Sequence, residues 1–522
     1  MRFMSWFKFK YLTILIPIGL VSINILVLGC KKDPDDPVKP NPNDQYDVEI
    51  ITPRSVPIGV SFPVAIYEHS NHIRVDAWQD FTVNSSPTLT NSREVIVKRG
   101  KGAGVFIASQ VGDCEINLYS DNILGRINDY SIPLNIIELE FTHEISGTIT
   151  QEEALWGMDE VIYISDNLTI PSEVELNIQS GVIVLLNTNT NIIIEGAIQI
   201  EGTSESPVLF SFHPDAEGWG EIQINNGVGN INWCFFTGGG NDPTMEFGHS
   251  ESQPVIHLEN ANIQMNNCFF VDNPGKAVGA IYSEVTLDSC LITRCDTGGE
   301  YLFTQLDVNS TWFIDIPNGN GEEVDDDNDA IYVNDPPASS TAASSIKNCV
   351  FVTGKDDGID HNGAILSISN CVIEDFDNEG IAASDKNSLY VYNTFIKDCE
   401  QGIEAGYGTP HLIVDHCLFI NNEIGIRFGD WYTWRDSEGL LEVTNSISIN
   451  NSLHNVWNYV MSTELPRDNS LFITYSIVND SFYDNNEGNI KGTPVFTSEY
   501  LLFSSSLGVS AGSDGLNIGL IP

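Results

Sequence analysis

From about residue 145 to the C-terminus, short apolar runs alternate with turns rich in asparagine, aspartate and glycine. The runs contain many β-branched and aromatic residues and show no helical periodicity, which predicts many short β-strands. One position of the pattern holds a small residue followed by two apolar residues, as at Cys268, Cys290, Cys349 and Cys371. The clearest of these positions lie 22 or 23 residues apart. A fixed period in this range predicts a solenoid of repeated coils.

The coils predict an all-β fold whose main domain is a right-handed parallel β-helix over residues 145–522. Residues 168–212 resemble the opening coils of secreted β-helix proteins and residues 492–519 resemble their closing coil, which implies coils at both places. The same small-residue position recurs along the chain at Cys234, Cys268, Cys290, Thr311, Cys349, Cys371, Thr394, Cys417, Ser446 and Ser476. Stacked on rungs about 4.8 Å apart, these side chains point the same way rather than at each other. The cysteines are therefore expected to be free, packed thiols rather than disulfides.

Residues 46–140 lack the repeat and show short alternating strands and turns. Their number and length predict a small immunoglobulin-like β-sandwich. This segment contains only Cys114, so the usual disulfide between the two sheets is excluded. A spacer or a secondary binding module is the expected role.

The first 30 residues are typical of a secretory signal, with Arg2, Lys8 and Lys10 preceding an apolar stretch from Tyr11 to Leu28. The stretch ends in "VLGC", which resembles the lipobox of bacterial lipoproteins. The resemblance implies cleavage before Cys30, a lipid on its thiol, and a tether over residues 31–45. It also implies an anchored position on the outer membrane or cell surface of a Gram-negative bacterium. The alternative is a plain transmembrane anchor.

The charge balance is strongly acidic, with 23 Lys and Arg against 72 Asp and Glu and a formal net charge of −49. Such a surface repels nucleic acid and anionic membranes. An anionic polysaccharide would be repelled too, unless a divalent cation joined the two. The composition therefore favours cations or neutral partners, and the chain is expected to act as a monomer without nucleic acid.

The segment "DDGID" at 356–360 places three aspartates close together. Aligning the coils on Ile331, Ile359 and Ile381 puts Asp329, Asp357 and Glu379 at equivalent positions of successive coils. Carboxylates about 4.8 Å apart cannot all ionise without compensation. A bound Ca²⁺, which prefers such oxygen ligands, is one explanation; the other is that water, protons or lysine compensate the charge.

One residue after each of these isoleucines a second ladder is expected, with Asp360, Ala382, Glu404 and Arg427 on successive rungs. Asp360 and Glu404 would then lie roughly 9.5 Å apart along the backbone at about 4.8 Å per rung. Inverting glycosidases use carboxyl separations of about 6.5–9.5 Å. Arg427 is expected to keep Glu404 ionised as a base, and the nearby aspartates to raise the pKa of Asp360 as an acid. A surface ladder without chemistry is the alternative.

Four further residues fall near this ladder: His361, Trp431, Tyr432 and Trp434. Exposed aromatic rings on a β-helix flank suit stacking against sugars, so these residues are candidates for substrate binding. The aromatic loop could equally cap the core.

The "DDGID" run, with Asp329 one coil earlier, resembles the calcium site of one group of β-helical pectate lyases. The resemblance implies Asp329, Asp356, Asp357 and Asp360 as Ca²⁺ ligands. Those lyases also use a lysine as base, and here Ala382 and Glu404 stand where it is expected. The resemblance thus extends to the calcium site but not to the base of the lyase reaction.

Two functions remain open from the sequence. In the first, a lipid-anchored β-helix protein binds and cleaves a polysaccharide, as a hydrolase or a lyase, with assistance from calcium. In the second, a surface adhesin or structural module has only a structural calcium site. A β-helix fold alone does not decide between them. The deciding observation is whether the second ladder and the Trp431 loop face one groove.

Overall fold

The computed structural model describes residues 48–68, 78–86, 89, 95–119, 131–317, 327–337, 342–483 and 486–522. The predicted signal segment 1–30, the lipidation site Cys30 and the tether 31–45 lie outside these residues. No helix in the described part of the chain is long and apolar enough to cross a membrane.

The N-terminal strands form a small antiparallel unit. In chain order they are β1 (Val48–Ile51), β2 (Ser55–Pro57), β3 (Ser61–Glu68), β4 (Trp78–Ser86), β5 (Val95–Lys98), β6 (Lys101–Ile107), β7 (Gly112–Tyr119) and β8 (Ser131–Ile137). Their order in the sheet is β1-β3-β6-β5-β4-β7-β8-β2, and every pairing is antiparallel except β2–β8. The two halves of β4 pair with β5 and with β7, so this strand joins two smaller sheets.

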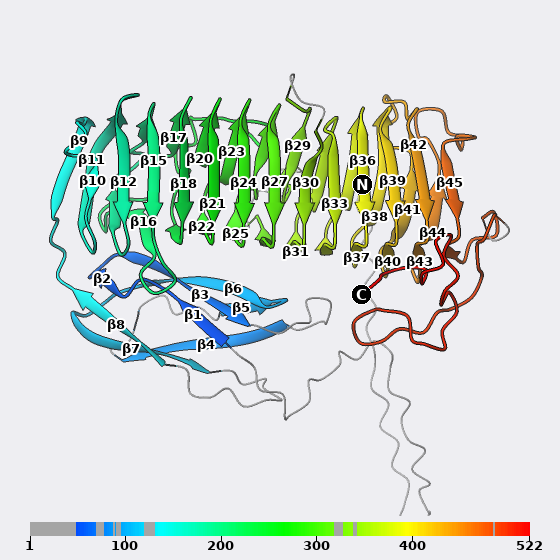
Figure 1. Cartoon of the computed structure of the whole chain (residues 1–522), viewed down its shortest axis with the longest axis horizontal. Helices are drawn as coiled ribbons and strands as arrows, with labels where there is room; N and C mark the ends of the chain where they lie inside the picture. The colour runs from blue at the N-terminus through cyan, green and yellow to red at the C-terminus, as the bar shows by residue number, and fades with distance from the viewer. Residues whose placement is uncertain are drawn as a thin grey trace, which may run out of the picture. The chain divides into compact units, whose positions relative to one another are not determined.

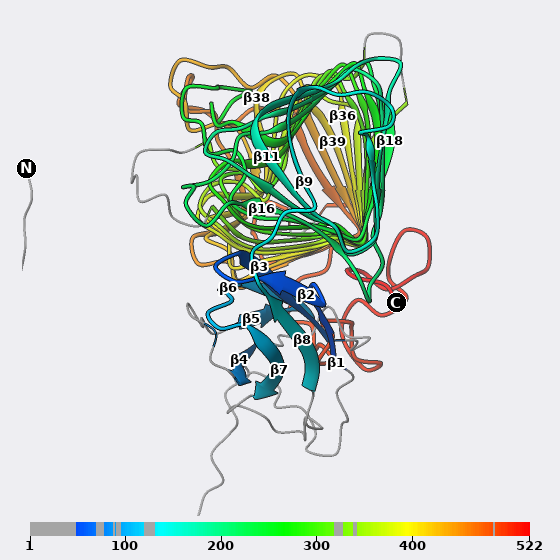
Figure 2. The same cartoon turned by 90° about the vertical axis from the view of Figure 1, so that its left-hand side faces the viewer.

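The rest of the strands coil as a right-handed parallel β-helix with three parallel faces, which confirms the predicted fold class. The first face is a 13-stranded sheet whose strands follow one another in Figure 1: β10 (Leu155–Trp156), β12 (Glu175–Gln179), β15 (Ala197–Glu201), β18 (Val228–Asn232), β21 (Asn262–Asn266), β24 (Glu284–Asp288), β27 (Gln305–Asn309), β30 (Ser344–Lys347), β33 (Leu366–Ser369), β36 (Ser388–Tyr392), β39 (His411–Asp415), β42 (Leu440–Thr444) and β45 (Leu471–Thr474). Viewed along the stack, successive coils lie behind one another (Figure 2).

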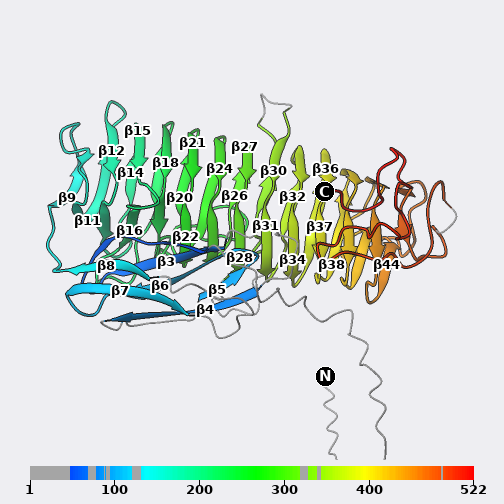
Figure 3. The ribbon, with the colours of Figure 1, turned by 60° about the horizontal axis from the view of Figure 1, so that its bottom comes forward.

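Strands of the second face and strands of the third face alternate along the chain. The second face contains β13 (Ile183–Leu186), β16 (Val208–Phe212), β19 (Cys234–Phe236), β22 (Phe269–Asn273), β25 (Leu291–Cys295), β28 (Trp312–Ile316), β31 (Val350–Gly354), β34 (Val372–Phe376), β37 (Phe395–Lys397), β40 (Leu418–Ile420), β43 (Ile447–Ile449) and β46 (Ile477–Val478). The third face contains β14 (Ile192–Ile194), β17 (Ile222–Asn225), β20 (Pro254–Glu259), β23 (Lys276–Ile281), β26 (Glu300–Leu302), β29 (Tyr332–Asn334), β32 (Ile359–Asn362), β35 (Glu379–Asp385), β38 (Gln401–Gly408), β41 (Ile424–Phe428) and β44 (His454–Asn458), several of which are labelled in order in Figure 3. The first coil is formed by β9 (His143–Thr148) and β11 (Val161–Ile170), and β11 extends over both faces.

The recurring small residues lie inside the coil at the corner between the first and second faces. The cysteines of this column and Thr311, Thr394, Ser446 and Ser476 are all buried, and the cysteines are free thiols, as predicted. The residue before each of them has a positive φ, for example Asn267 (52°) and Asn348 (55°). Asparagine tolerates this left-handed conformation better than most residues, which explains its frequency at the corner.

The second face is covered along its length. Its apolar residues share one buried cluster with the N-terminal sheets, through residues such as Phe62, Phe106 and Phe269. Further along the chain, Val350, Val372, Phe395, Leu418 and Ile447 of this face pack with Leu502, Ile518 and Leu520. The C-terminal segment therefore does not add a coil at 492–519, since β46 is the last paired strand and the segment packs on the second face instead. The third face carries the candidate site.

Candidate functional site

The second predicted ladder forms one column on the third face. Tyr332 pairs with Asp360, Asp360 with Ala382, and Ala382 with Glu404. Glu404 pairs in turn with Arg427, and Arg427 with Trp457. The register expected from the isoleucine spacing is therefore confirmed, with Ala382 between the two carboxyl groups.

The column continues further toward the N-terminus than the sequence indicated. Upstream of Tyr332 it contains Glu300, Gly279 and His257. Glu300, His257 and Trp457 were not predicted as members of this column. The spacing stretches to 32 residues between Glu300 and Tyr332 and to 30 residues between Arg427 and Trp457, so the fixed period that aligned the other coils could not be carried across these two steps.

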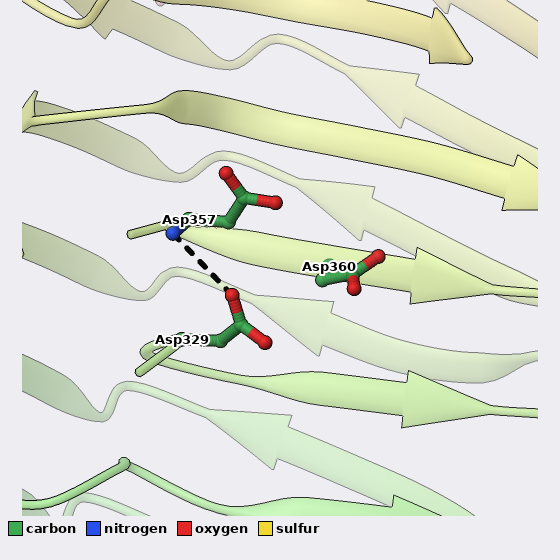
Figure 4. A group of neighbouring side chains, drawn as sticks. All are labelled: Asp329, Asp357 and Asp360. Atoms are coloured by element: carbon green, nitrogen blue, oxygen red, sulfur yellow. Dashed lines mark hydrogen bonds between the residues drawn. The ribbon is translucent and has the colours of Figure 1, made fainter. Parts of the chain in front are cut away.

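Three carboxylates beside this column form a group that could hold a metal ion. Asp329, Asp357 and Asp360 each offer one oxygen, and these oxygens lie within 4.8 Å of one another (Figure 4). The backbone N–H of Asp357 donates to Oδ1 of Asp329 over 3.3 Å. Asp356, the fourth predicted ligand, instead accepts a hydrogen bond of 2.6 Å from Nδ2 of Asn378 and lies outside this group.

Without a cation, burial and mutual repulsion disfavour the charged forms of these carboxylates. Burial, and then the neighbouring Asp356, raise the pKa of Asp329 well above its ordinary value. Burial and Glu379 raise the pKa of Asp357 in the same direction. The pKa of Asp356 rises to about 8 and that of Asp360 to about 7, with burial as the largest cause of both. A divalent cation would reverse these shifts, because it favours the charged carboxylates.

The carboxylates line a groove of about 340 Å³. Trp431 and Tyr432 line the same groove, so the ladder and the aromatic loop meet at one site. The complete lining is His249, Asp327, Asp329, Asp356, Asp357, Asp360, Asn362, Asn378, Glu379, Ala382, Ala383, Ser384, Glu404, Tyr407, Asp430, Trp431, Tyr432 and Arg435.

Three predicted site residues are not part of this lining. His361 is fully buried, and its Nε2 lies 2.6 Å from the carbonyl oxygen of Ala364. Its position follows from strand alternation, because Asp360 faces the groove and the next side chain faces the core. Trp434 is 71% exposed outside the groove, and Arg427 is fully buried beneath it.

Arg427, on the rung after Glu404, contacts both Glu404 and Gln401. Its Nη1 lies 3.5 Å from Oε2 of Glu404 and donates over 3.1 Å to Oε1 of Gln401. Oε2 of Glu404 accepts no hydrogen bond from any described residue, although it is buried at the groove wall. The carboxyl group of Glu404 is thus held by its ion pair with Arg427, which faces the buried Oε2.

The expected ionisation of Glu404 is wrong in direction. Burial and the nearby Glu379 raise the pKa of Glu404 well above its ordinary value, and Arg427 only partly offsets them. The raised pKa of Asp360 agrees with the expectation, but burial and Glu379 cause it more than Asp356 and Asp357 do. Burial is the dominant cause for both groups, and it could not be predicted from the spacing of the residues.

The aromatic loop covers Arg427 and leaves part of its aromatic surface exposed. The ring of Trp431 lies 3.9 Å from the guanidinium of Arg427 and covers it, while 43% of the residue remains exposed. Arg435 lies over the rings of Tyr407, Tyr432 and Trp434 at 4.0–4.6 Å. These cation–π contacts stabilise the loop and leave aromatic surface beside the carboxylates.

Comparisons with known proteins agree with the coil architecture. A family model described as "Right handed beta helix region" matches residues 318–482. No curated protein matches the sequence. Among solved structures, similarity is found to the A-module of the Azotobacter vinelandii mannuronan C-5 epimerase AlgE6, with 10% identity, a TM-score of 0.27, and coverage of 66% of this chain and 93% of that one.

Two further structures are similar at the same level. An alginate lyase from Paenibacillus sp. has 12% identity and a TM-score of 0.19, with 53% of this chain and 91% of the other covered. The catalytic domain of a GH87 α-1,3-glucanase, solved with tetrasaccharides, has 8% identity and a TM-score of 0.31, with 83% and 90% covered. The function is therefore inferred from the groove itself.

Proposed function

We propose that this protein binds a polysaccharide in the acidic groove of the third face and hydrolyses it with Asp360 and Glu404. The observation that carries the proposal is the column Asp360–Ala382–Glu404 beside the exposed rings of Trp431 and Tyr432. Carboxyl groups provide acid–base chemistry, and aromatic rings provide a surface on which sugar rings stack.

The two carboxyl groups are suited to opposite roles. They lie on alternate rungs, roughly 9.5 Å apart in backbone terms at about 4.8 Å per rung, and the small Ala382 leaves space between them. Inverting hydrolysis requires about 6.5–9.5 Å, which leaves room for the attacking water. One carboxyl group protonates the glycosidic oxygen as its bond to the anomeric carbon breaks. The other takes a proton from the water that attacks this carbon from the opposite side.

The structure favours Glu404 as the acid, the reverse of the expectation from sequence. Glu404 is buried at the groove wall, and burial together with the nearby Glu379 raises its pKa, which favours the protonated form that an acid needs. Asp360 is the more exposed of the pair and belongs to the three-carboxylate group. Asp360 also lines the groove, where it could take the proton of the attacking water.

Arg427 acts as a positioning residue in this proposal. It is buried, is not part of the groove lining, and contacts both Glu404 and the ring of Trp431. A planar guanidinium can stack on an aromatic ring and approach a carboxylate at the same time, which a lysine ammonium cannot do equally well. Arg427 thereby links the sugar-stacking ring to the proposed acid.

Asp329, Asp357 and Asp360 are the residues proposed to hold Ca²⁺. The fit rests on three oxygen-only donors, of which Asp329 and Asp357 are buried and Asp360 is partly exposed, and whose pKa values are all raised in the absence of a cation. A bound Ca²⁺ would supply positive charge. This charge would keep Asp360 ionised and would attract an acidic sugar. Without it, the eight carboxylates of the groove lining favour a neutral glycan.

The location proposed for this activity is the cell surface. The support is the apolar N-terminal stretch ending in "VLGC", which would place a lipid on Cys30 in a Gram-negative outer membrane. Labelling with a radioactive fatty acid would test it, since Cys30→Ala should abolish incorporation. Unchanged labelling of that variant would contradict the proposal.

The function is tested by incubating protein that lacks residues 1–30 with plant, algal and microbial polysaccharides, with and without Ca²⁺. Hydrolysis should release reducing ends without ultraviolet absorbance. An unsaturated, ultraviolet-absorbing product would instead indicate a lyase. Glycan binding without either product would indicate the non-catalytic surface module.

A further inference from the structure

The column of the third face is open to solvent over only a short length. Asp360 and Ala382 are partly exposed, and Glu404 lies at the groove wall. Tyr332, on the preceding rung, is only 5% exposed, and Arg427, on the following rung, is completely buried. The column is therefore covered immediately before and immediately after the proposed catalytic pair.

The upstream cover is the segment 242–252, between β19 and β20. The ring of Phe247 packs on Gly279 of the column, where an added Cβ would lie 2.8 Å from Cδ1 of Phe247. The backbone carbonyl of Phe247 accepts a hydrogen bond from Nζ of Lys276. Because Gly279 has no side chain, the ring of Phe247 can occupy this position and the segment can pack on the column.

Glu300 fixes the same segment at its backbone. This carboxylate is 1% exposed and lies 2.7 Å from Nζ of Lys276. It accepts hydrogen bonds from the backbone N–H groups of His249 and Ser250 over 2.6 and 2.8 Å. Charge-assisted hydrogen bonds in a buried position are strong, so the segment is held firmly on the column.

His249 completes this upstream wall. Its ring stacks on Tyr332 with centroids 5.0 Å apart and planes 6° from parallel. The stack covers the rung directly before Asp360, and His249 is itself part of the groove lining.

The downstream wall is aromatic. Trp431 covers Arg427 and meets Trp457, on the next rung, edge to face with centroids 4.9 Å apart. The guanidinium of Arg427 also lies 4.9 Å from the centre of the Trp457 ring. Trp431 therefore stands across the column on the rung directly after Glu404.

The space between the walls is short. Four rung steps separate Tyr332 from Arg427, roughly 19 Å at about 4.8 Å per rung. The groove volume of about 340 Å³ is near the lower end of the range, about 300–1,000 Å³, of sites that enclose a single small molecule. A long glycan lying along the column would have to pass through both walls.

We propose that the groove accepts one end of the glycan, so that the enzyme releases short products from chain ends. This inference rests on the proposed hydrolysis and adds its mode of action. The walls, which are separate from the proposed acid and base, would determine it.

The test follows early products from polygalacturonate, alginate, laminarin and xylan, by size separation and by solution viscosity. Cleavage from chain ends (end action) should yield only short products from the outset, while the viscosity of the solution falls slowly. A ladder of intermediate lengths with a rapid fall in viscosity would overturn end action, leave hydrolysis intact, and mean that the chain crosses the groove between the walls. No cleavage of any of the four would count against both the proposed function and this inference.

A second measurement uses a variant with an opened wall. Phe247→Ala combined with His249→Ala should shift early products toward intermediate lengths, because the upstream cover is removed. Tyr282→Ala is the matched control, since Tyr282 is 57% exposed and lies outside the groove lining. Unchanged short products in a folded double variant would overturn the role of this wall.

Discussion

At the scale of single residues, the position of the acidic side chains was predictable and their protonation was not. The spacing of Ile359, Ile381 and Ile403 correctly aligned Asp360 with Glu404 across Ala382. The pKa of Glu404 is set mainly by burial, which depends on the loop that carries Trp431 and Asp430. The folding of such a loop over the face leaves no periodic signal in the sequence.

The raised pKa values predict how stability depends on pH. Folded Asp360 and Asp356 have pKa values of about 7 and about 8, whereas an unfolded aspartate titrates near about 3.9. Between these values the folded state holds more protons, so in a chelator stability should fall as pH rises from about 4 to about 8. Melting temperatures measured across this range would check it, and a rise with pH would contradict it.

Calcium should restore part of the stability that is lost as the pH rises. If the three-carboxylate group binds Ca²⁺, millimolar Ca²⁺ should raise the melting temperature more at pH 8 than at pH 5, because binding requires ionised ligands. Asp357→Asn should lose most of the gain. The control Asp307→Asn alters an exposed aspartate on the first face and should keep it. Equal gains in both variants would rule out this group as the site.

At the scale of strands, the coil was predictable because one corner repeats in every turn. A residue with positive φ is followed by a small buried residue and then by two apolar residues, as at Asn348 and Cys349. The irregular insertions were not predictable. The segment 242–252 follows no period, yet it covers Tyr332 and forms one wall of the groove.

Burial inside the coil predicts slow reactions at the cysteine thiols. Burial raises the pKa of Cys295 and Cys417 to about 12, so little thiolate is available even where a reagent could enter. Alkylation of native protein at pH 8 should therefore be slow and should become fast on unfolding. Mass spectrometry would measure both rates, and disulfides between neighbouring coil cysteines would contradict the observed packing.

At the scale of the whole described chain, the second face is buried and the third face is left for the groove. The N-terminal sheets and the C-terminal segment both pack on the second face. The sequence indicated that both segments exist, but not which face they cover, because each meets the coil through apolar residues far apart in sequence. Covering one face in this way protects apolar side chains without blocking the carboxylates.

The C-terminal cover should contribute to stability rather than to the site. Removing residues 486–522 would expose Phe395, Leu418 and Ile447, which pack with Leu502, Ile518 and Leu520. A clear fall in melting temperature and more binding of a hydrophobic dye are expected. An unchanged melting temperature would show that this packing is dispensable.

The most direct test of the central claim compares glycan turnover with glycan binding in Glu404→Gln and Asp360→Asn. The substrate is whichever polysaccharide the intact protein cleaves. Each variant should abolish turnover while glycan binding remains nearly unchanged, because each keeps its shape and loses one step of proton transfer. The melting temperature without Ca²⁺ should show that both variants are folded, and Asp360→Asn should also lose part of the Ca²⁺-dependent gain. The control Glu284→Gln, an exposed position on the first face, should keep full activity. Full turnover by folded Glu404→Gln would contradict the claim that this groove is a hydrolytic site.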